Sequence, residues 1–310
     1  MSEIERTAIL GAGVIGSSWA ALFLASGRSV TVFDPDPNTE ASVRAYIEKA
    51  WPTLDELNLT DRATPDAISF VSTAEVAVQG AQFIQENVPE RLPVKHSIYA
   101  QIEPALNADA IVSSSTSGLT LEALQAGWRD PSNLILGHPF NPPHLIPLVE
   151  LTANGATGSD VLNRTERFYK DIGKVTIRIN KGMPGHVANR LQAAVWREAV
   201  HMAVEGVASV EDIDKAMWAG PGLRWAAMGP TTLFHLGAGD GGLQAFCDHF
   251  KDTFNGWWDD LGDPRLDEEV IRKLVDGVAE HAQGQSVEEL SMQRDKMLTA
   301  MQKAIQHLRT

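Results

Sequence analysis

The residues best suited to chemistry in this sequence are a serine, a histidine and a glutamate. They are Ser117, His138 in the segment Gly-His-Pro-Phe-Asn-Pro, and Glu150. A histidine titrates close to neutral pH, so it can accept and return a proton, while a carboxylate can hold its ring in one tautomer. These three side chains predict a site for proton transfer.

A glycine loop near the start of the chain indicates what accompanies the proton transfer. The loop is Gly11-Ala-Gly13-Val-Ile-Gly16, between an expected strand at 7–10 and an expected helix at 14–26. Such glycines allow a tight turn, the approach of a pyrophosphate and close packing of a helix whose N-terminus attracts phosphate. The loop predicts a dinucleotide site, so we expect proton transfer to be coupled to hydride transfer.

Asp34 follows the next expected strand, at 30–33, and indicates which dinucleotide binds. Its carboxylate can accept hydrogen bonds from ribose hydroxyls, whereas a 2′-phosphate would meet its negative charge. Pro35 and Asp36 follow it, instead of an arginine. We therefore expect NAD rather than NADP. The alternative is a glycine-rich turn with a capping aspartate and no ligand.

Short apolar runs alternate with helical stretches through the first part of the chain. Further strands are expected at 68–71, 83–84, 110–112, 134–136, 148–151 and 175–179. This alternation predicts an α/β fold with a Rossmann-type, doubly wound, mainly parallel sheet. After about residue 182 the strand signals cease, and helices are expected at 187–207, 210–218, 243–250, 268–282 and 287–308. The second domain should be all-helical.

Glycines and a proline in the segment 181–185 mark the change of pattern. Such residues punctuate regular structure. We therefore expect an NAD-binding domain at 1–182 and a helical domain at 183–310 that binds the substrate.

The composition argues against several kinds of partner. The 310 residues carry a formal net charge of -14, which repels nucleic acid and anionic membranes. No apolar run approaches the roughly 20 residues of a membrane helix, and the start of the chain lacks the basic region of a signal peptide. The single cysteine, Cys247, suits a reducing compartment, and we expect its thiol to be buried. The histidines lack zinc-site spacing. We expect a cytoplasmic protein with no metal.

Taken together, these motifs resemble the L-3-hydroxyacyl-CoA dehydrogenase family over nearly the whole chain. The resemblance rests on the glycine loop and on segments 86–95, 114–119, 137–150 and 189–190. It is stronger for the branch acting on free 3-hydroxy acids, which includes L-gulonate 3-dehydrogenase, lambda-crystallin and carnitine dehydrogenase. The resemblance implies NAD-dependent oxidation of a free L-3-hydroxy acid to the 3-keto acid, by a homodimer formed through the helical domain.

The resemblance also implies roles for individual residues. His138 would be the general base that takes the hydroxyl proton, and Glu150 would pair with it. Ser117 and Asn189 match positions that hydrogen-bond the reacting oxygen or its neighbours. Three residues match the nicotinamide side of the cofactor: Glu90, Lys95 and Asn141. The alternative is a structural set, in which a serine turn, a capping histidine and a core glutamate do no chemistry.

Arg224 is the candidate for binding the substrate carboxylate. It lies in segment 220–230, which resembles the Gly-x-Arg-Trp pattern of the free-acid branch. Its planar guanidinium matches a carboxylate bidentately, unless it pairs with a nearby acid at the surface. Tryptophans at positions 218, 225, 257 and 258 offer a face for a quaternary ammonium such as that of carnitine, or pack in the core. The carnitine branch tends to have Gly-Asp-Arg where this chain has Ala-Asn-Arg at 188–190. This departure leaves gulonate-like or short aliphatic 3-hydroxy acids open as substrates.

Two other functions stay open at this stage. A 3-hydroxyacyl-CoA dehydrogenase would act on a short-chain thioester, but the helical half offers Arg224 without an obvious lysine and arginine cluster for the CoA phosphates. A non-catalytic, crystallin-like protein would use the scaffold alone. The intact set of serine, histidine, glutamate and asparagine argues against that alternative.

Overall fold

The computed structural model describes residues 3–309, with side chains described as far as residue 305. The chain forms two compact units, Met1–Ala188 with Arg294–Gln306 and Asn189–Gln293 with His307–Thr310. They are called the first unit and the helical unit below, and each is described by itself. The domain boundary expected at residue 182 stays a prediction.

The first unit is built on an eight-stranded sheet in the order β3-β2-β1-β4-β5-β6-β7-β8. The strands are β1 (Arg6–Leu10), β2 (Ser29–Phe33), β3 (Ile68–Phe70), β4 (Phe83–Glu86), β5 (Ile111–Ser114), β6 (Leu134–Pro139), β7 (Leu148–Thr152) and β8 (Val175–Arg178). Every neighbouring pair is parallel except β6 and β7. The predicted α/β fold with a Rossmann-type, mainly parallel sheet is confirmed.

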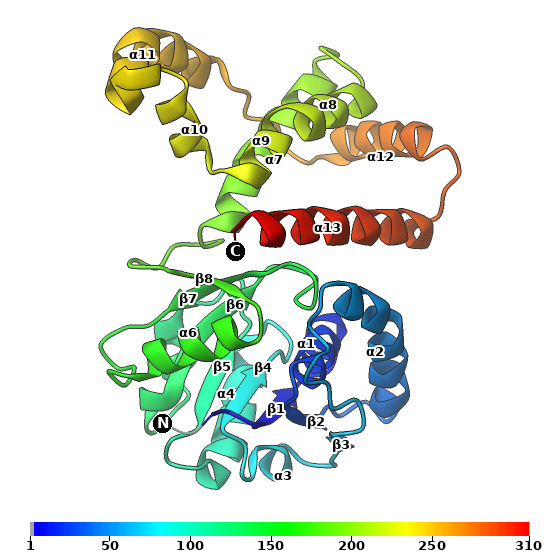
Figure 1. The fold of residues 1–310 in the computed structure, drawn as a ribbon, viewed down its shortest axis with the longest axis vertical. Helices are drawn as coiled ribbons and strands as arrows, with labels where there is room; N and C mark the ends of the chain where they lie inside the picture. The colour runs from blue at the N-terminus through cyan, green and yellow to red at the C-terminus, as the bar shows by residue number, and fades with distance from the viewer. Residues whose placement is uncertain (1–2, 310) are drawn as a thin grey trace. The chain divides into compact units, whose positions relative to one another are not determined.

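Helices cover both faces of this sheet (Figure 1). One face packs against α1 (Val14–Ala25), α2 (Thr39–Glu56) and α6 (Val161–Asp171), and the other against α3 (Ala74–Val78), α4 (Leu92–Ile102) and α5 (Leu121–Gln125). Strand side chains alternate between the two cores, so that Ile9 lies in one and Ala8 in the other. Because both faces are buried, the strands are short continuous apolar runs, which is why the sequence revealed them.

The strand order changes direction at β1, since β2 lies on one side of it and β4 on the other. At such a point the loops at the carboxyl ends diverge and leave a crevice, where ligands bind in open α/β sheets. The candidate residues of the first unit gather at this edge: Gly11 follows β1, Asp34 follows β2, Glu90 follows β4, Ser117 follows β5, and His138 lies near the end of β6.

The helical unit and the last helix contain no strand among the described residues after β8, which confirms the all-helical prediction. The helices are α7 (Ala188–Val204), α8 (Val210–Met217), α9 (Leu223–Ala227), α10 (Pro230–Leu236), α11 (Gly242–Asp260), α12 (Glu268–Ala282) and α13 (Val287–Arg309). The short helices α9 and α10 were not predicted, because neither is long enough to show a helical period. The helix expected at 243–250 continues to Asp260.

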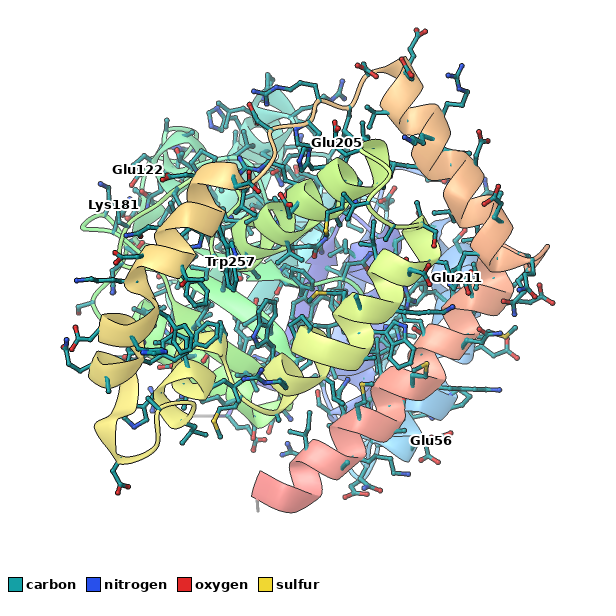
Figure 2. The ribbon with its side chains drawn as sticks, turned by 90° about the horizontal axis from the view of Figure 1, so that it is seen from above. Glu56, Glu122, Lys181, Glu205, Glu211 and Trp257 are labelled. Atoms are coloured by element: carbon teal, nitrogen blue, oxygen red, sulfur yellow. The ribbon has the colours of Figure 1, made fainter. Side chains whose placement is uncertain are left out.

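Few apolar side chains of the helical unit are buried. Large ones are exposed instead, among them Trp218, Trp257 and Trp258, and Figure 2 shows Trp257 on α11. The expectation that Cys247 is buried was wrong, because α11 buries only Gly242. In the part of the chain that the structure describes, no helix is long and apolar enough to cross a membrane.

Candidate active site

His138 and Glu150 meet across the antiparallel pair of β6 and β7. They are register partners, so their side chains leave the same face of the sheet close together. Nδ1 of His138 lies 2.8 Å from Oε2 of Glu150. His138 is 6% exposed and Glu150 is fully buried. The structure therefore brings together the imidazole and the carboxylate that the sequence singled out.

The second oxygen of Glu150 is held by the main chain. Oε1 accepts hydrogen bonds from the amides of Val187 and Ala188, each 2.9 Å long. Burial alone would raise the pKa of Glu150, but the hydrogen bonds from His138 and these two amides lower it. An ionised carboxylate accepts the proton on Nδ1 of His138, so Nε2 keeps a free lone pair. The sequence contained no signal for the two amides, because any residue supplies one.

Ser117 lies on an exposed loop that Glu90 organises. Oε1 of Glu90 accepts hydrogen bonds from the amides of Ser117 at 2.9 Å and Gly118 at 2.7 Å, and from the hydroxyl of Thr116. Burial acts to raise the pKa of Glu90, but these hydrogen bonds and the charge of Lys95 lower it. Glu90 thus holds the loop through its charge and leaves the hydroxyl of Ser117 unengaged among the described residues.

Lys95 is fixed by Glu86, a residue that the sequence did not single out. Its side chain is 1% exposed, and Nζ lies 2.7 Å from Oε1 of Glu86 and 3.7 Å from Oε2 of Glu90. The other oxygen of Glu86 accepts hydrogen bonds from Tyr99 at 2.7 Å and Ser114 at 2.6 Å. The ammonium of Lys95 is therefore engaged inside the protein. A glutamate at the end of an apolar strand was the available signal.

Asn141 lies on the loop 140–147 between β6 and β7. It is exposed and precedes a cis peptide bond to Pro142. Lys174 donates hydrogen bonds to two carbonyls of the loop, and burial lowers the pKa of this lysine to about 7. His144 is anchored by a 2.9 Å contact between its Nδ1 and Oγ of Ser18. These contacts hold the loop beside the strands that carry His138 and Glu150.

The glycine loop has the shape that a dinucleotide site needs. A Cβ on Gly11 would lie 2.7 Å from the carbonyl carbon of Asn87, and one on Gly16 would lie 2.0 Å from the carbonyl oxygen of Gly11. A Cβ on Gly13 would meet nothing within 4 Å. The loop is thus packed tightly behind and open in front, where a pyrophosphate would approach the N-terminus of α1.

Asp34 ties the glycine loop to β2 and borders a cavity. Its oxygens accept hydrogen bonds from the amides of Ala12 at 2.7 Å and Asp36 at 2.9 Å, and each keeps capacity for a ribose hydroxyl. The cavity beside it, of about 490 Å³, has apolar walls that include Val88, Pro89, Pro93, Val94 and Ile98. An apolar slot next to a carboxylate suits an adenosine group. These residues fit NAD.

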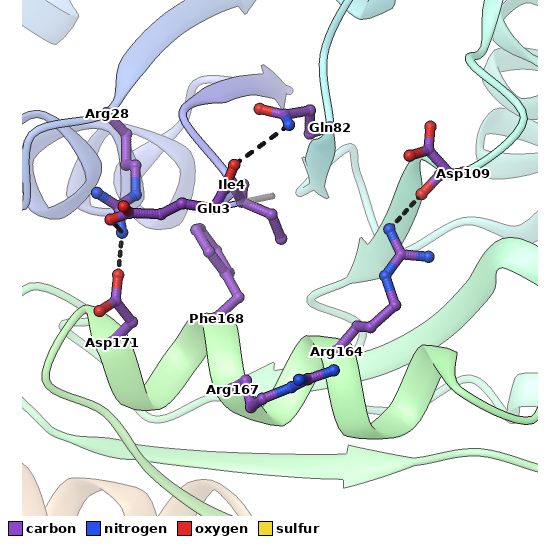
Figure 3. Close-up of a pocket in the computed structure, with 9 residues that line it drawn as sticks. All are labelled: Glu3, Ile4, Arg28, Gln82, Asp109, Arg164, Arg167, Phe168 and Asp171. Atoms are coloured by element: carbon purple, nitrogen blue, oxygen red, sulfur yellow. Dashed lines mark hydrogen bonds and ion pairs between the residues drawn. The ribbon is translucent and has the colours of Figure 1, made fainter. Parts of the chain in front are cut away.

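A different cavity, of about 300 Å³, lies at the amino ends of the strands (Figure 3). Arg28 pairs there with Asp171 and lies 3.2 Å from Glu3, while Arg164 donates a 2.6 Å hydrogen bond to the carbonyl of Asp109. Arg28 is thus already paired with acidic side chains. The cavity also lies at the edge of the sheet opposite to the candidate site. We therefore do not assign the active site to this cavity.

Two candidate residues lie in the helical unit. Asn189 is in the first turn of α7, and Arg224 is on α9. The side chain of Arg224 is exposed and forms no ion pair with any residue that the structure describes. The alternative in which it pairs with a neighbouring acid is therefore not observed. Trp225 beside it is 36% exposed.

Comparisons with known proteins match both parts of the chain. The 3-hydroxyacyl-CoA dehydrogenase NAD binding domain matches residues 6–182, and the C-terminal domain of that family matches residues 185–283. L-carnitine dehydrogenase of Streptomyces coelicolor is 44% identical over 294 residues, which cover 95% of this chain and 92% of the relative. L-carnitine dehydrogenase of Pseudomonas aeruginosa is 39% identical over 305 residues, with 98% and 95% covered.

Solved structures agree with these matches. The 5-dehydrogenase of 5-formyl-3-hydroxy-2-methylpyridine 4-carboxylic acid, an NAD+-dependent dismutase, aligns with a TM-score of 0.83 at 27% identity and covers 98% of this chain and 99% of its own. FadB2 of M. tuberculosis aligns with a TM-score of 0.67 at 28% identity, with 89% and 95% covered.

The fold, the cofactor loop and these comparisons define an NAD-dependent oxidoreductase that acts on CH–OH groups. NAD is its cofactor. The chain belongs to the 3-hydroxyacyl-CoA dehydrogenase family. The family, cofactor and enzyme class expected from the motifs are confirmed.

The buried pair of Glu86 and Lys95 generates a prediction about stability. Glu86→Gln or Lys95→Met alone leaves a buried charge without its partner, so each should destabilise the protein by about 3–5 kcal/mol. The double variant should lose less than the two single losses added together. Calorimetric unfolding of the three variants checks this. Lys170→Met, which removes an exposed ammonium and leaves Glu166 paired with Arg178, is the control and should change little. Strictly additive losses would contradict the pairing.

Proposed function

We propose that the protein oxidises the C3 hydroxyl of a free L-3-hydroxy acid to the 3-keto acid, with NAD as the oxidant. The observation that carries the proposal is the hydrogen bond between Nδ1 of His138 and an ionised Glu150, which leaves Nε2 available as a general base. Relatives named L-carnitine dehydrogenase support a free acid over a CoA thioester.

The reaction divides into a hydride and a proton. NAD supplies the acceptor for the hydride that leaves C3. Nε2 of His138 takes the proton of the hydroxyl as the C3–O bond becomes a carbonyl, and Glu150 stabilises the resulting imidazolium. The unengaged hydroxyl of Ser117 hydrogen-bonds the reacting oxygen, and Asn189 is assigned to the same oxygen or its neighbours.

L-carnitine is the substrate that we propose first. Identity of 38% to 44% with relatives of that name outweighs the departure from the carnitine pattern at 188–190. The tryptophans at positions 218, 225, 257 and 258 of the helical unit are exposed rather than packed in a core. An aromatic face of this kind attracts a quaternary ammonium. We assign Arg224 to the carboxylate of the same substrate.

We further propose a cytoplasmic homodimer formed through the helical unit. The buried apolar residues of that unit are few, namely Val200, Ala203, Ile213, Val270 and Ala282, and its exposed ones are many and large. Apolar surface of this extent is typical of association with another protein surface.

A substrate screen tests the proposed activity. NADH formation should be seen with L-carnitine, L-gulonate or 3-hydroxybutyrate, and the reverse reaction should consume NADH with free acetoacetate faster than with acetoacetyl-CoA. His138→Ala should abolish both, because it removes the imidazole whose Nδ1 is held by Glu150 and whose Nε2 takes the proton. Preference for the thioester would establish the CoA alternative, and activity that survives His138→Ala would reject the mechanism.

Replacement of Glu150 by glutamine tests the pairing. Glu150→Gln removes the charge that holds the histidine tautomer and stabilises the imidazolium, so kcat should fall by about two to four orders of magnitude. The Kd for NADH, measured by fluorescence, should hardly change. Glu122→Gln is the matched control, because Glu122 is an exposed glutamate of the first unit that accepts a hydrogen bond from Asn154. Equal effects of the two variants would contradict the assignment.

Replacement of Arg224 tests carboxylate binding. Arg224→Met keeps the length of the side chain but loses the charge-assisted hydrogen bonds, so the KM for the acid should rise about tenfold or more. The KM for NAD should stay constant. Arg197→Met provides the comparison, since Arg197 lies on α7 and faces Asp263 at 4.0 Å. An unchanged KM for the acid in Arg224→Met would refute this role.

A further inference from the structure

His186 is a buried imidazole beside His138 that has no partner of its own. Its side chain is 5% exposed, and neither ring nitrogen forms a hydrogen bond with any described residue. The centroid of its ring lies 4.9 Å from that of His138, with 41° between the planes. Buried polar atoms are almost always paired in proteins, and an unpaired one is costly. Two unpaired nitrogens in one ring next to the candidate base point to a ligand.

The backbone ties His186 to the catalytic pair. Its φ of 50° lies in the left-handed region, which few side chains adopt without a reason. The next two residues, Val187 and Ala188, donate the amides that hold Glu150. The position of the His186 ring is thus set by the same short segment that positions the carboxylate.

The charge state of His186 follows from its surroundings. Burial lowers its pKa, and the neighbouring His138 lowers it further, against smaller opposite effects of Glu150, the Thr116 carbonyl and Glu90. A neutral imidazole offers one N–H donor and one acceptor. Both oxygens of Glu150 and one of Glu90 already accept hydrogen bonds from the chain. The Thr116 carbonyl is close enough to affect the pKa of His186, but neither ring nitrogen forms a hydrogen bond of normal geometry with it. The His186 donor is therefore left for a bound molecule.

We propose that His186 donates a hydrogen bond to the carboxylate of the free acid and so fixes the spacing between that carboxylate and the reacting hydroxyl. The inference rests on the proposed function. A 3-hydroxy acid carries these groups on C1 and C3, and their separation is comparable with that of the two imidazole rings. A 2-hydroxy acid brings the groups closer together. A carboxylate has about four lone-pair sites, so a hydrogen bond from His186 leaves others for further donors.

The test compares each acid with its methyl ester, which keeps the C3 hydroxyl but offers only a weaker, uncharged acceptor. The probes are L-carnitine, 3-hydroxybutyrate and their methyl esters. His186→Asn keeps a donor, while His186→Gly removes it, and both residues tolerate a positive φ. We expect His186→Gly to lower kcat/KM for the acids by about ten- to hundredfold, with a much smaller fall for the esters. His186→Asn should keep part of the acid preference.

Three controls separate this role from others. The melting temperature and the Kd for NADH, measured on each variant, show whether fold and cofactor binding persist. His96→Phe removes another histidine, one whose Nε2 contacts the Ala123 carbonyl at 2.7 Å, and should leave the ratio of acid to ester unchanged. His186→Phe keeps a ring without nitrogens, and should resemble His186→Gly if the donor matters.

The outcomes distinguish the inference from the proposed function. Three results would overturn the role of His186: equal losses of kcat/KM for acids and esters, no loss for either, or a Kd for NADH that rises as kcat/KM falls. An unaltered wild-type protein that oxidises none of the acids would instead overturn the proposed function, before any variant is measured. Selective loss for the acids supports both.

Discussion

The pairing of His138 with Glu150 depends on the one reversal of strand direction in the sheet. Because β7 runs antiparallel to β6, the chain returns through a short loop, and the two residues become direct register partners. Residues opposite each other in an antiparallel pair place their Cβ atoms about 4.5–5.5 Å apart. If β7 ran parallel to β6, the chain between them would need a long crossover connection. The reversal thus lets one short segment supply both members of the pair.

The strand that carries His138 also has to accommodate a polar network behind it. Gly137 precedes the histidine, and a Cβ there would lie 2.3 Å from Oγ of Ser113 and 2.7 Å from the hydroxyl of Tyr169. These two hydroxyls are 2.8 Å apart, and Tyr169 donates a 2.7 Å hydrogen bond to Gln85. Glycine at this position therefore serves packing, because only a missing side chain leaves room for the network under the site.

The sequence predicted those features that follow from pattern or residue type. Buried parallel strands are apolar runs, so the sheet was found, and the chemistry of His138 and Glu150 singled out a pair that the structure brings together. Features made by the backbone or by distant partners were missed. The amides that hold Glu150 carry no residue signature, and α9 and α10 are too short to show a period. The buried partner of Lys95 is Glu86 at the end of β4, which the sequence did not single out.

His186 is another residue whose surroundings could not be predicted from the sequence. In the sequence it was one of several histidines without metal-site spacing, and surface or packing roles were the natural expectation. Its significance lies in a ring contact with a residue almost fifty positions away and in two nitrogens without partners. Neither is visible before the chain folds, because both depend on which loop covers the end of which strand.

The two main-chain hydrogen bonds to Glu150 affect how such a site can change during evolution. Since main-chain amides hold the carboxylate, the side chains at positions 187 and 188 are free to vary, and only proline, which lacks the N–H, is barred from them. Mutation can alter what surrounds the reacting group while the proton-transfer apparatus stays intact. A lineage of this family can therefore exchange these two side chains while the main chain keeps its hold on the carboxylate.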